Sequence, residues 1–431
     1  MKLYSTNDRN KLVTFREAVL KGISKDGGLF MPVSLPKMPD AFFERINILD
    51  MQDIAFAVSR TLLKEEIPDY DMFGIIRRAF TFTAPLVNLG KDKYVLELFH
   101  GPTLAFKDFG ARFLAETLSY FNKDENKELV ILVATSGDTG SAVANGFHNV
   151  PGVKVVLLYP SGKVSRIQEQ QLTTLGGNVT ALEILGNFDD CQRMVKQAFA
   201  DNELTSKVRI SSANSINIAR LLPQSFYYHY AYSQVEDRDK DVVFSVPSGN
   251  FGNLTGGLFA KEMGLPVHKF IAAVNTNDIF PQYLKTGEFK PKASVQTISN
   301  AMDVGNPSNF ARISSLFQGS VANVKDVIYS RSYTDDQTKN AINEVNNRYG
   351  YLIDPHGAVG YMALNDYLNE NPGLYSSIVL ETAHPAKFKD IVEKSSGTAV
   401  TVPKNLEQCL NKEKRSIVLP NEYEALKNIL L

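Results

Sequence analysis

The sequence predicts an α/β fold in which open, largely parallel sheets are flanked by helices and preceded by a mostly helical N-terminal region. From Tyr94 onward, short apolar runs alternate with glycine-containing turns and amphipathic stretches, which is the pattern of repeated strand–helix units. The run at 129–133 is apolar at every position, as expected of a strand covered on both faces. Sheets of this kind bind ligands beyond the carboxyl ends of their strands, where the polar loops of this chain lie.

At 431 residues the chain is too long for one compact core, so we expect it to divide into domains. We predict an N-terminal domain at 1–90, an α/β region at 91–390, and a C-terminal segment at 391–431 that packs on the body. The α/β region is expected to contain two subdomains, one at about 100–240 and one formed by the remainder.

The predicted elements follow the spacing of apolar residues. In the N-terminal region, Thr14 and Glu17 have capping-box spacing at the start of a helix, and helical spacing recurs over 50–63 and 71–79. Further along, strands are predicted at 129–133, 153–159, 179–185, 208–211, 241–246, 268–274 and 377–380, and helices at 108–122, 188–199, 216–232 and 335–349. A terminal helix is predicted at 421–431, with Asn421 as its N-cap.

Composition excludes several classes of function. The formal net charge of -1 gives no electrostatic case for binding nucleic acid or an anionic membrane. No apolar run approaches the roughly 18 residues that cross a bilayer. The first ten residues have no apolar core typical of a signal peptide, and Cys191 and Cys409 lie far apart, as in a reducing compartment. We therefore expect a cytoplasmic protein, monomeric or homodimeric, with a small-molecule partner and buried or half-buried thiols.

Lys107 is the first candidate for chemistry. It follows Phe106 and a Gly-Pro turn, and an amphipathic helix begins directly after it. Burial and the positive end of a helix dipole both disfavour an ammonium ion, so we expect Lys107 to have a lowered proton affinity. A lysine of this kind suits Schiff-base chemistry with a carbonyl cofactor, although most lysines in a first helical turn are simply solvated.

Residues 248–253 form the strongest predicted anion site, because two glycines let the backbone approach a ligand where a helix begins. This loop has neither a Walker sequence nor GxGxxG spacing, and a tight turn that binds nothing is the alternative. Residues 135–141 form a second such loop, able to hold a carboxylate or merely to cap a helix. Lys163 and Arg166 lie one helical turn apart, and the two interpretations are that they face an anion or that they are solvated. Arg220 could likewise bind a phosphate through two hydrogen bonds or lie on the surface.

The sequence gives little support for a catalytic histidine, a metal site or a serine hydrolase. His356 and His384 each precede a helix, where capping or core roles are more common than catalysis. The chain has no metal-ligand spacing and no GxSxG elbow, so we predict neither a metal nor a serine hydrolase. Thr382, in contrast, follows a late apolar strand. A perturbed lysine, two anion-receptive loops and this threonine together fit pyridoxal phosphate.

At these residues the chain resembles the threonine synthase family of fold-type II pyridoxal-phosphate enzymes, which share the tryptophan synthase β-like fold. The resemblance runs nearly end to end and is to the long bacterial and fungal form. It rests on residues 100–110, HGPTLAFKDFG, on the loops at 135–141 and 248–253, on ETAHP at 381–385, and on the N-terminal segment 22–32.

The resemblance implies a role for each matching position. Lys107 is the Schiff-base lysine, preceded by the usual Phe106, and Thr382 is the partner of the ring nitrogen. The cofactor phosphate is implied to lie against Ser248, Gly249, Asn250, Phe251, Gly252 and Asn253. Asp138, where many relatives have asparagine, is expected near the cofactor's 3-hydroxyl, and Thr135, Ser136, Gly137 and Thr139 near the substrate carboxylate. Our candidates for the substrate phosphate are Lys163, Ser215, Asn217 and Arg220.

The implied reaction converts O-phospho-L-homoserine and water into L-threonine and phosphate, the last step of threonine biosynthesis. Lys107 is expected to hold the cofactor and then to act as general base. One alternative on the same scaffold is a phospholyase or a hydroxy-amino-acid dehydratase. A second alternative, of another class, is a non-catalytic anion-binding α/β protein.

Overall fold

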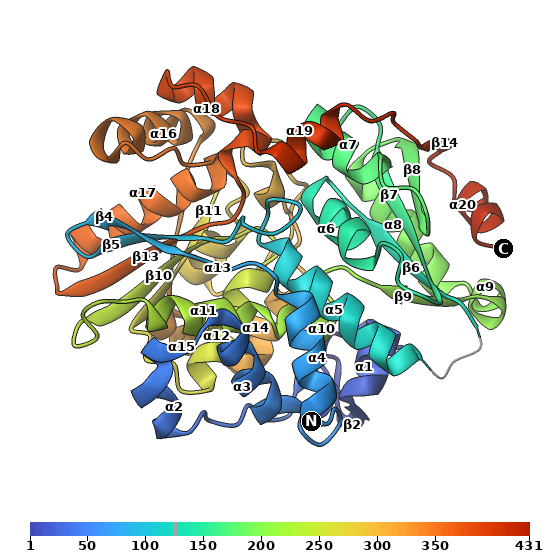
Figure 1. Ribbon diagram of the computed structural model, residues 1–431, viewed down its shortest axis with the longest axis horizontal. Coiled ribbons are helices and arrows are strands. Elements are labelled where there is room, and N and C mark those ends of the chain that lie inside the picture. The colour runs from blue at the N-terminus through green and yellow to red at the C-terminus, as the bar shows by residue number, and fades with distance from the viewer. Residues whose placement is uncertain (124–126) are drawn as a thin grey trace.

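The computed structural model describes residues 1–123 and 127–431. Two large sheets lie side by side, and the N-terminal helices run along one end of both (Figure 1). One sheet has the strand order β12-β11-β10-β13-β5-β4 and is parallel except for the β4–β5 pair, while the other, β14-β8-β7-β6-β9, is parallel throughout. The predicted α/β class is therefore confirmed.

The N-terminal region contains four helices: α1 (Phe15–Lys21), α2 (Asp40–Arg45), α3 (Met51–Leu63) and α4 (Asp69–Ala79). The capping box at Thr14 is present as predicted. The region also contains a small antiparallel sheet of β1 (Lys2–Ser5), β2 (Asp8–Thr14) and β3 (Phe30–Pro32), which the helical prediction missed. The first five residues of β2 are exposed, so this strand shows no apolar alternation in the sequence.

The five-stranded sheet consists of β6 (Leu129–Ala134), β7 (Val153–Pro160), β8 (Val179–Leu185), β9 (Arg209–Ser212) and β14 (Ile417–Pro420). It is associated with α5 (Lys107–Asn122), α6 (Asp138–Phe147), α7 (Arg166–Thr173), α8 (Phe188–Ala200) and α9 (Asn202–Lys207). Along β6, Ile131 and Val133 pack in one hydrophobic cluster and Val130 and Leu132 in another. Burial on both faces explains why this strand is apolar at every position.

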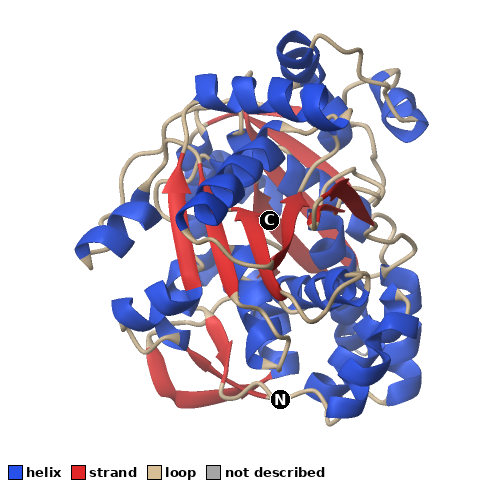
Figure 2. Cartoon of the chain, turned by 90° about the vertical axis from the view of Figure 1, so that its left-hand side faces the viewer, coloured by secondary structure: helices blue, strands red, loops and turns tan. Residues whose placement is uncertain are grey.

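The six-stranded sheet consists of β4 (Leu86–Gly90), β5 (Lys93–Glu97), β10 (Asp241–Pro247), β11 (Lys269–Val274), β12 (Ile328–Ser332) and β13 (Tyr375–Glu381). Helices cover both faces of the sheets (Figure 2). The helices of this half are α12 (Gly252–Glu262), α13 (Ile279–Thr286), α14 (Phe310–Leu316), α15 (Val321–Val327), α16 (Asp335–Tyr349) and α17 (Pro355–Glu370). Short 3-10 helices lie at Ile46–Ile48, Asn300–Met302 and Pro385–Phe388.

The predicted helices at 216–232 and 421–431 differ from those in the structure. The stretch 216–232 forms two helices, α10 (Ile218–Leu221) and α11 (Gln224–Ser233), because Pro223 between them has no amide hydrogen with which to continue the first helix. At the C-terminus, α18 (Lys389–Ser396) and α19 (Lys404–Leu410) precede β14 and α20 (Tyr423–Leu430). The N-cap of α20 is Glu422, without a side-chain cap, so the prediction of Asn421 was wrong.

Candidate active site

Polar loops at the carboxyl ends of β6, β10 and β13 meet around a cavity of about 220 Å³. The cavity wall combines segments that are far apart in the sequence. It includes Phe106, Lys107, Thr135, Ser136, Thr139, Ser215, Arg220, Ser248, Gly249, Asn250, Phe251, Gly252, Asn253 and Thr382. Most of the residues predicted to form the site therefore share one space.

Lys107 begins α5, and its side chain is only 15% exposed. Burial lowers the pKa of its amine to about 8, although the Asp138 carboxylate opposes this shift; Lys387 and Arg220 reinforce it. The Lys107 Nζ atom lies 3.9 Å from Asp138 Oδ2, which is too long for a hydrogen bond. Lys107 therefore combines a lowered proton affinity with a position at the cavity wall, as predicted.

The turn before Lys107 is held by Asp108. Its buried carboxylate accepts hydrogen bonds from the backbone amide of Thr103 at 2.9 Å and from the Thr103 hydroxyl at 2.6 Å. A Cβ atom on Gly101 would collide with Asp108 Oδ2, so glycine is needed for the turn to fold against this side chain. Burial raises the pKa of Asp108 to about 6. Asp108 is thus structural, and it fixes the direction in which α5 begins.

The 248–253 loop leads into the N-terminus of α12, whose N-cap Phe251 adopts a left-handed conformation with φ of 57°. A Cβ atom on Gly249 would lie 2.7 Å from the carbonyl oxygen of Ala301 and 2.8 Å from Met302 Cα. Asn253 Oδ1 accepts hydrogen bonds from the hydroxyls of Tyr227 and Tyr228, both at 2.7 Å.

The Nδ2 atom of Asn253, in contrast, is buried and has no hydrogen-bond partner among the described residues. An unpaired donor of this kind is costly unless a ligand accepts its hydrogen bond. Together with the first amide groups of α12, it makes the 248–253 loop fit a phosphate group.

The 135–141 loop is organised by the Thr135 hydroxyl, which accepts hydrogen bonds from the amides of Gly137 at 3.0 Å and Gly140 at 2.8 Å. The Thr135 hydroxyl thus pairs with amides at the start of α6, but the N-cap is Gly137, so the predicted Ser/Thr/Asp N-cap is not found. Gly137 has a φ of 135°, and a Cβ atom there would collide with the side chain of Gln168. Ser136 and Thr139 face the cavity on either side of this turn.

Asp138 is buried, and its carboxylate is paired on one side. Lys387 Nζ lies 2.7 Å from Asp138 Oδ1, and Gln168 Nε2 donates a 3.1 Å hydrogen bond to the same oxygen. Burial alone would raise the pKa of Asp138, but Lys387 and Lys107 outweigh burial and hold this pKa well below its usual range. The sequence gives no signal for Lys387, because a lysine in a charged C-terminal stretch is normally on the surface.

Two of the four candidates for the substrate phosphate lie at the cavity. Arg220 is buried, its Nη1 donates a 2.6 Å hydrogen bond to the Ala213 carbonyl, and its Nε has no partner among the described residues. Burial lowers the pKa of Arg220 to about 10, so it remains a cation at neutral pH. The Ser215 hydroxyl accepts a 2.7 Å hydrogen bond from Asn250 Nδ2, which links it to the 248–253 loop.

The other two candidates are placed elsewhere. Lys163 is exposed and is not among the described residues that line the cavity. Asn217 is buried, but its Oδ1 accepts from the Ala219 amide at 3.1 Å and its Nδ2 donates to the Val19 carbonyl at 3.0 Å. Asn217 therefore caps α10 and joins it to α1, and its polar atoms are used within the protein. The structure supports neither residue as a ligand of the substrate phosphate.

His384 and His356 have different roles in the structure. His384 Nδ1 accepts a hydrogen bond from the Ala386 amide at 3.0 Å, so its predicted capping role is confirmed. His356 lines the cavity, pairs with Asp354 and accepts a hydrogen bond from the Ala301 amide at 3.2 Å, which holds the loop facing Gly249. Within 1–123 and 127–431, no group of His, Cys, Asp or Glu side chains is arranged to hold a metal ion.

Comparison with known proteins identifies the family. Residues 83–380 match the family model for pyridoxal-phosphate dependent enzymes, 2–80 match the threonine synthase N terminus, and 357–430 match the threonine synthase C-terminal model. The chain is 45% identical to the threonine synthase of Escherichia coli (strain K12) over 100% of this chain and 99% of the relative. The chain belongs to the threonine synthase family.

Solved threonine synthases share the whole fold. The E. coli structure superposes with a TM-score of 0.94 and covers 100% of this chain, which covers 99% of that structure. The pyridoxal-phosphate-bound threonine synthase from Brucella melitensis is 35% identical and superposes with a TM-score of 0.91. It also covers 100% of this chain, which covers 98% of it. Threonine deaminase isoform 2 from Solanum lycopersicum, at 16% identity and a TM-score of 0.57, shares the fold alone. The predicted fold-type II class, lyase chemistry and pyridoxal phosphate cofactor are thus confirmed.

Proposed function

We propose that this chain converts O-phospho-L-homoserine and water into L-threonine and phosphate by β,γ-replacement. One observation carries the proposal: two separate anion-receptive groups face the same lysine across one cavity. The 248–253 loop is suited to the phosphate of the cofactor, which leaves Arg220 and Ser215 for a second phosphate. A phosphorylated substrate needs this second position, whereas an unphosphorylated hydroxy amino acid does not.

Residues of this chain fit each part of pyridoxal phosphate, which when bound supplies an electron sink for the pair left by removal of the Cα proton. Lys107 would hold the cofactor through its amine, and residues Ser248 to Asn253 its phosphate. Thr382 would partner the ring nitrogen, and its neutral hydroxyl would leave that nitrogen unprotonated. Asp138 would lie near the 3-hydroxyl. Because Thr382 adds no charge, the choice of reaction depends on well-positioned side chains.

Lys107 has a second role in this proposal. Lys107 Nζ, when it is not bonded to the cofactor, would accept the Cα proton and later return it. Arg220 and Ser215 would hold the phosphate while it is bonded to Cγ and after it leaves. Overall, the proton lost from Cβ would end on Cγ, and water would supply the hydroxyl at Cβ. The 135–141 loop, with Ser136 and Thr139 at the cavity, would bind the substrate carboxylate through its hydroxyl and amide groups.

Other features of the chain agree with this function. Cys191 is buried and Cys409 half-buried, and both are free thiols, as predicted. We propose that the enzyme acts in the cytoplasm, where thiols stay reduced. Among the described residues, no helix combines the length and hydropathy needed to cross a bilayer.

The decisive experiment measures products and spectrum together. The purified protein with pyridoxal phosphate should show a band near about 410–420 nm and should release phosphate and L-threonine in equal amounts from O-phospho-L-homoserine. Phosphate with 2-oxobutanoate and no threonine would instead identify a phospholyase. Turnover of threonine or serine without phosphate release would identify a dehydratase, and absence of the band a non-catalytic protein.

A further inference from the structure

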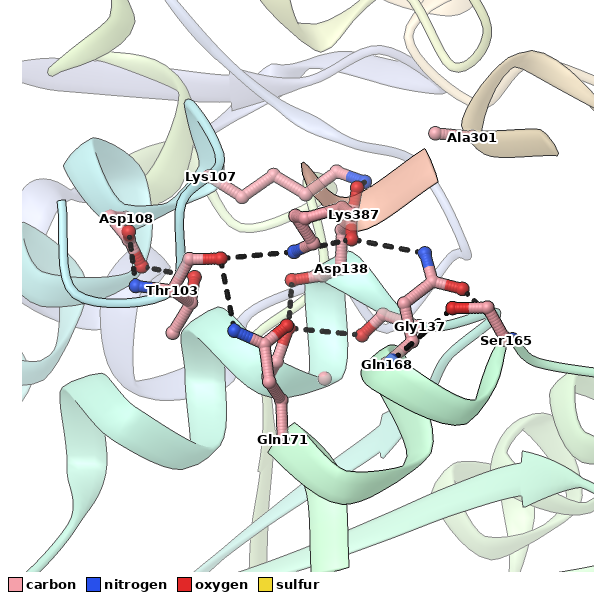
Figure 3. Close-up of polar contacts among 12 residues, drawn as sticks. Thr103, Lys107, Asp108, Gly137, Asp138, Ser165, Gln168, Gln171, Ala301 and Lys387 are labelled. Atoms are coloured by element: carbon pink, nitrogen blue, oxygen red, sulfur yellow. Dashed lines mark hydrogen bonds and ion pairs between the residues drawn. The ribbon is translucent and has the colours of Figure 1, made fainter. Parts of the chain in front are cut away.

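Lys387 is a buried lysine that the mechanism above does not use. It lies in the 3-10 helix Pro385–Phe388, five residues after Thr382, and its side chain is fully buried. Its Nζ pairs with Asp138 Oδ1 at 2.7 Å and donates a hydrogen bond of 3.0 Å to the Thr103 carbonyl. Figure 3 shows the Lys107 and Lys387 side chains converging on Asp138 from two different segments.

The two oxygens of Asp138 have different surroundings. Oδ1 forms the ion pair with Lys387 and accepts the hydrogen bond from Gln168. Its partners therefore come from the 3-10 helix Pro385–Phe388 and from α7. Oδ2 is the oxygen that lies 3.9 Å from Lys107 Nζ. These contacts fix the rotation of the Asp138 carboxylate. Oδ1 pairs with Lys387, and Oδ2 points toward Lys107.

A carboxylate beside a general base poses a difficulty. A buried carboxylate without a partner favours its neutral form, because burial penalises the charge. Such a group would compete with Lys107 for any proton that arrives there. The charged groups that act on Lys107 are Asp138 from α6, Lys387 from the 3-10 helix and Arg220 from α10. Of the two cations in this set, Lys387 is the one that forms an ion pair with Asp138. Lys387 can therefore decide whether a proton resides on Asp138 or on Lys107.

We infer that Lys387 is a positioning residue for the reaction: it keeps Asp138 ionised and turned toward Lys107, so that a transferred proton stays on Lys107. When Lys107 Nζ gains a proton, it becomes an ammonium ion beside Asp138 Oδ2, and Asp138 remains a carboxylate. Lys387 itself exchanges no proton. The inference rests on the proposed role of Lys107 as general base. The low pKa of Asp138 and the pKa of about 8 for Lys107 agree with this distribution of protons.

The test observes Asp138 directly, by infrared difference spectroscopy of the apo-protein at pH 7. The spectrum of Lys387→Met minus that of the Lys387→Met/Asp138→Asn double variant should show the carbonyl stretch of a protonated carboxylic acid. Wild type minus Asp138→Asn should show only carboxylate bands. Because no substrate is present, this result is independent of which phosphorylated amino acid the enzyme uses.

Kinetics of the holoenzyme provide the second readout. Lys387→Met should lower kcat at least tenfold at pH 7 while KM changes less than threefold, and Lys387→Arg, which keeps the charge, should recover part of kcat. Gln171→Leu is the matched control, because Gln171 Nε2 donates to the same Thr103 carbonyl at 3.2 Å without touching Asp138. Gln171→Leu should leave the infrared signal of Asp138 unchanged.

Three outcomes overturn the inference. One is a protonated Asp138 in active wild-type enzyme, which can be observed even if Lys387→Met does not fold. The second is a Lys387→Met variant that loses activity with no protonated-carboxyl signal. The third is a Lys387→Met variant that gains the signal but keeps kcat, because Lys387 would then have no part in the reaction.

Discussion

Phe106 and Thr382 are joined by a backbone hydrogen bond of 2.9 Å, in which the Phe106 amide donates to the Thr382 carbonyl. The residues next to them, Ala105 and Ala383, form an isolated β-bridge. The end of β13 is thus tied to the residue directly before Lys107. The predicted Schiff-base lysine and the predicted partner of the ring nitrogen therefore keep a fixed spacing, although 275 residues (382 − 107) separate them in the sequence.

Because this hydrogen bond uses backbone atoms, the Thr382 side chain can be changed separately. Thr382→Val keeps the shape of the residue and removes its hydroxyl. We expect the visible cofactor band to persist and kcat to fall about tenfold, or ~1.4 kcal/mol of transition-state stabilisation. Thr382→Ser, which restores the hydroxyl, should recover most of kcat. If valine and serine variants behave alike, the hydroxyl has no role at the ring nitrogen.

Lys107→Ala should abolish both the band near about 410–420 nm and the trapping of cofactor by borohydride, because no amine remains to form the imine. Lys163→Ala is the control, since Lys163 is exposed. Mass spectrometry of the reduced, digested protein locates the trapped cofactor. Trapping at any other lysine would falsify the assignment of Lys107.

The lowered pKa of Lys107 predicts how cofactor uptake depends on pH. Only the unprotonated amine attacks the aldehyde, and its fraction grows as pH rises toward the pKa of about 8. The rate at which apo-protein takes up pyridoxal phosphate should therefore rise about tenfold per pH unit below that value and level off above it. Uptake followed by absorbance between pH 6 and 9.5 measures the midpoint. A midpoint above 10 would mean a solvated lysine.

Gly249→Ala tests the close approach of the 248–253 loop to its neighbour. The new Cβ would lie 2.7 Å from the Ala301 carbonyl oxygen, so the loop must shift and the cofactor phosphate should bind at least tenfold more weakly, ~1.4 kcal/mol or more. Equilibrium titration of apo-protein with pyridoxal phosphate gives the Kd. Gly74→Ala is the matched control in α4, where the new Cβ meets only the flexible end of Arg78.

Arg220 and Lys163 make opposite predictions about the substrate phosphate. Arg220→Lys keeps the charge but loses the planar group that binds phosphate through two hydrogen bonds, so KM for O-phospho-L-homoserine should rise about tenfold or more. The visible band should stay, because we propose that the cofactor phosphate binds separately, at the 248–253 loop. Lys163→Met should change KM less than twofold. A larger effect of Lys163 than of Arg220 would reverse our assignment of the phosphate ligands.

The sequence predicted the strands well and the site in part. The strand at 179–185 was predicted with its observed limits, because turn residues at 176–178 and 186–187 bound a mostly apolar run. The small sheet of β1, β2 and β3 was missed because β2 is mostly exposed. The domain limits near residues 90, 240 and 390 stay predictions.

Candidate site residues could be proposed from the sequence where a motif is local. Lys107 and the 248–253 loop carry their chemistry within a few neighbouring positions. Lys387 was missed because its partner Asp138 is 249 residues away (387 − 138) and nothing nearby marks it as buried. Asn217 and Lys163 were proposed from spacing and from their position near helix termini, neither of which shows which way a side chain points.

The pairing of β14 with β8 has a consequence for how the chain folds during synthesis. β8 lies next to β7 on one side and needs residues 417–420 to cover its other side. Until the ribosome has released that segment, the nascent sheet presents a row of unpaired amide and carbonyl groups, which invites pairing with other chains. A chain that ends before Ile417 keeps this open edge permanently, so premature termination should produce aggregation even though the predicted Schiff-base lysine has long been made.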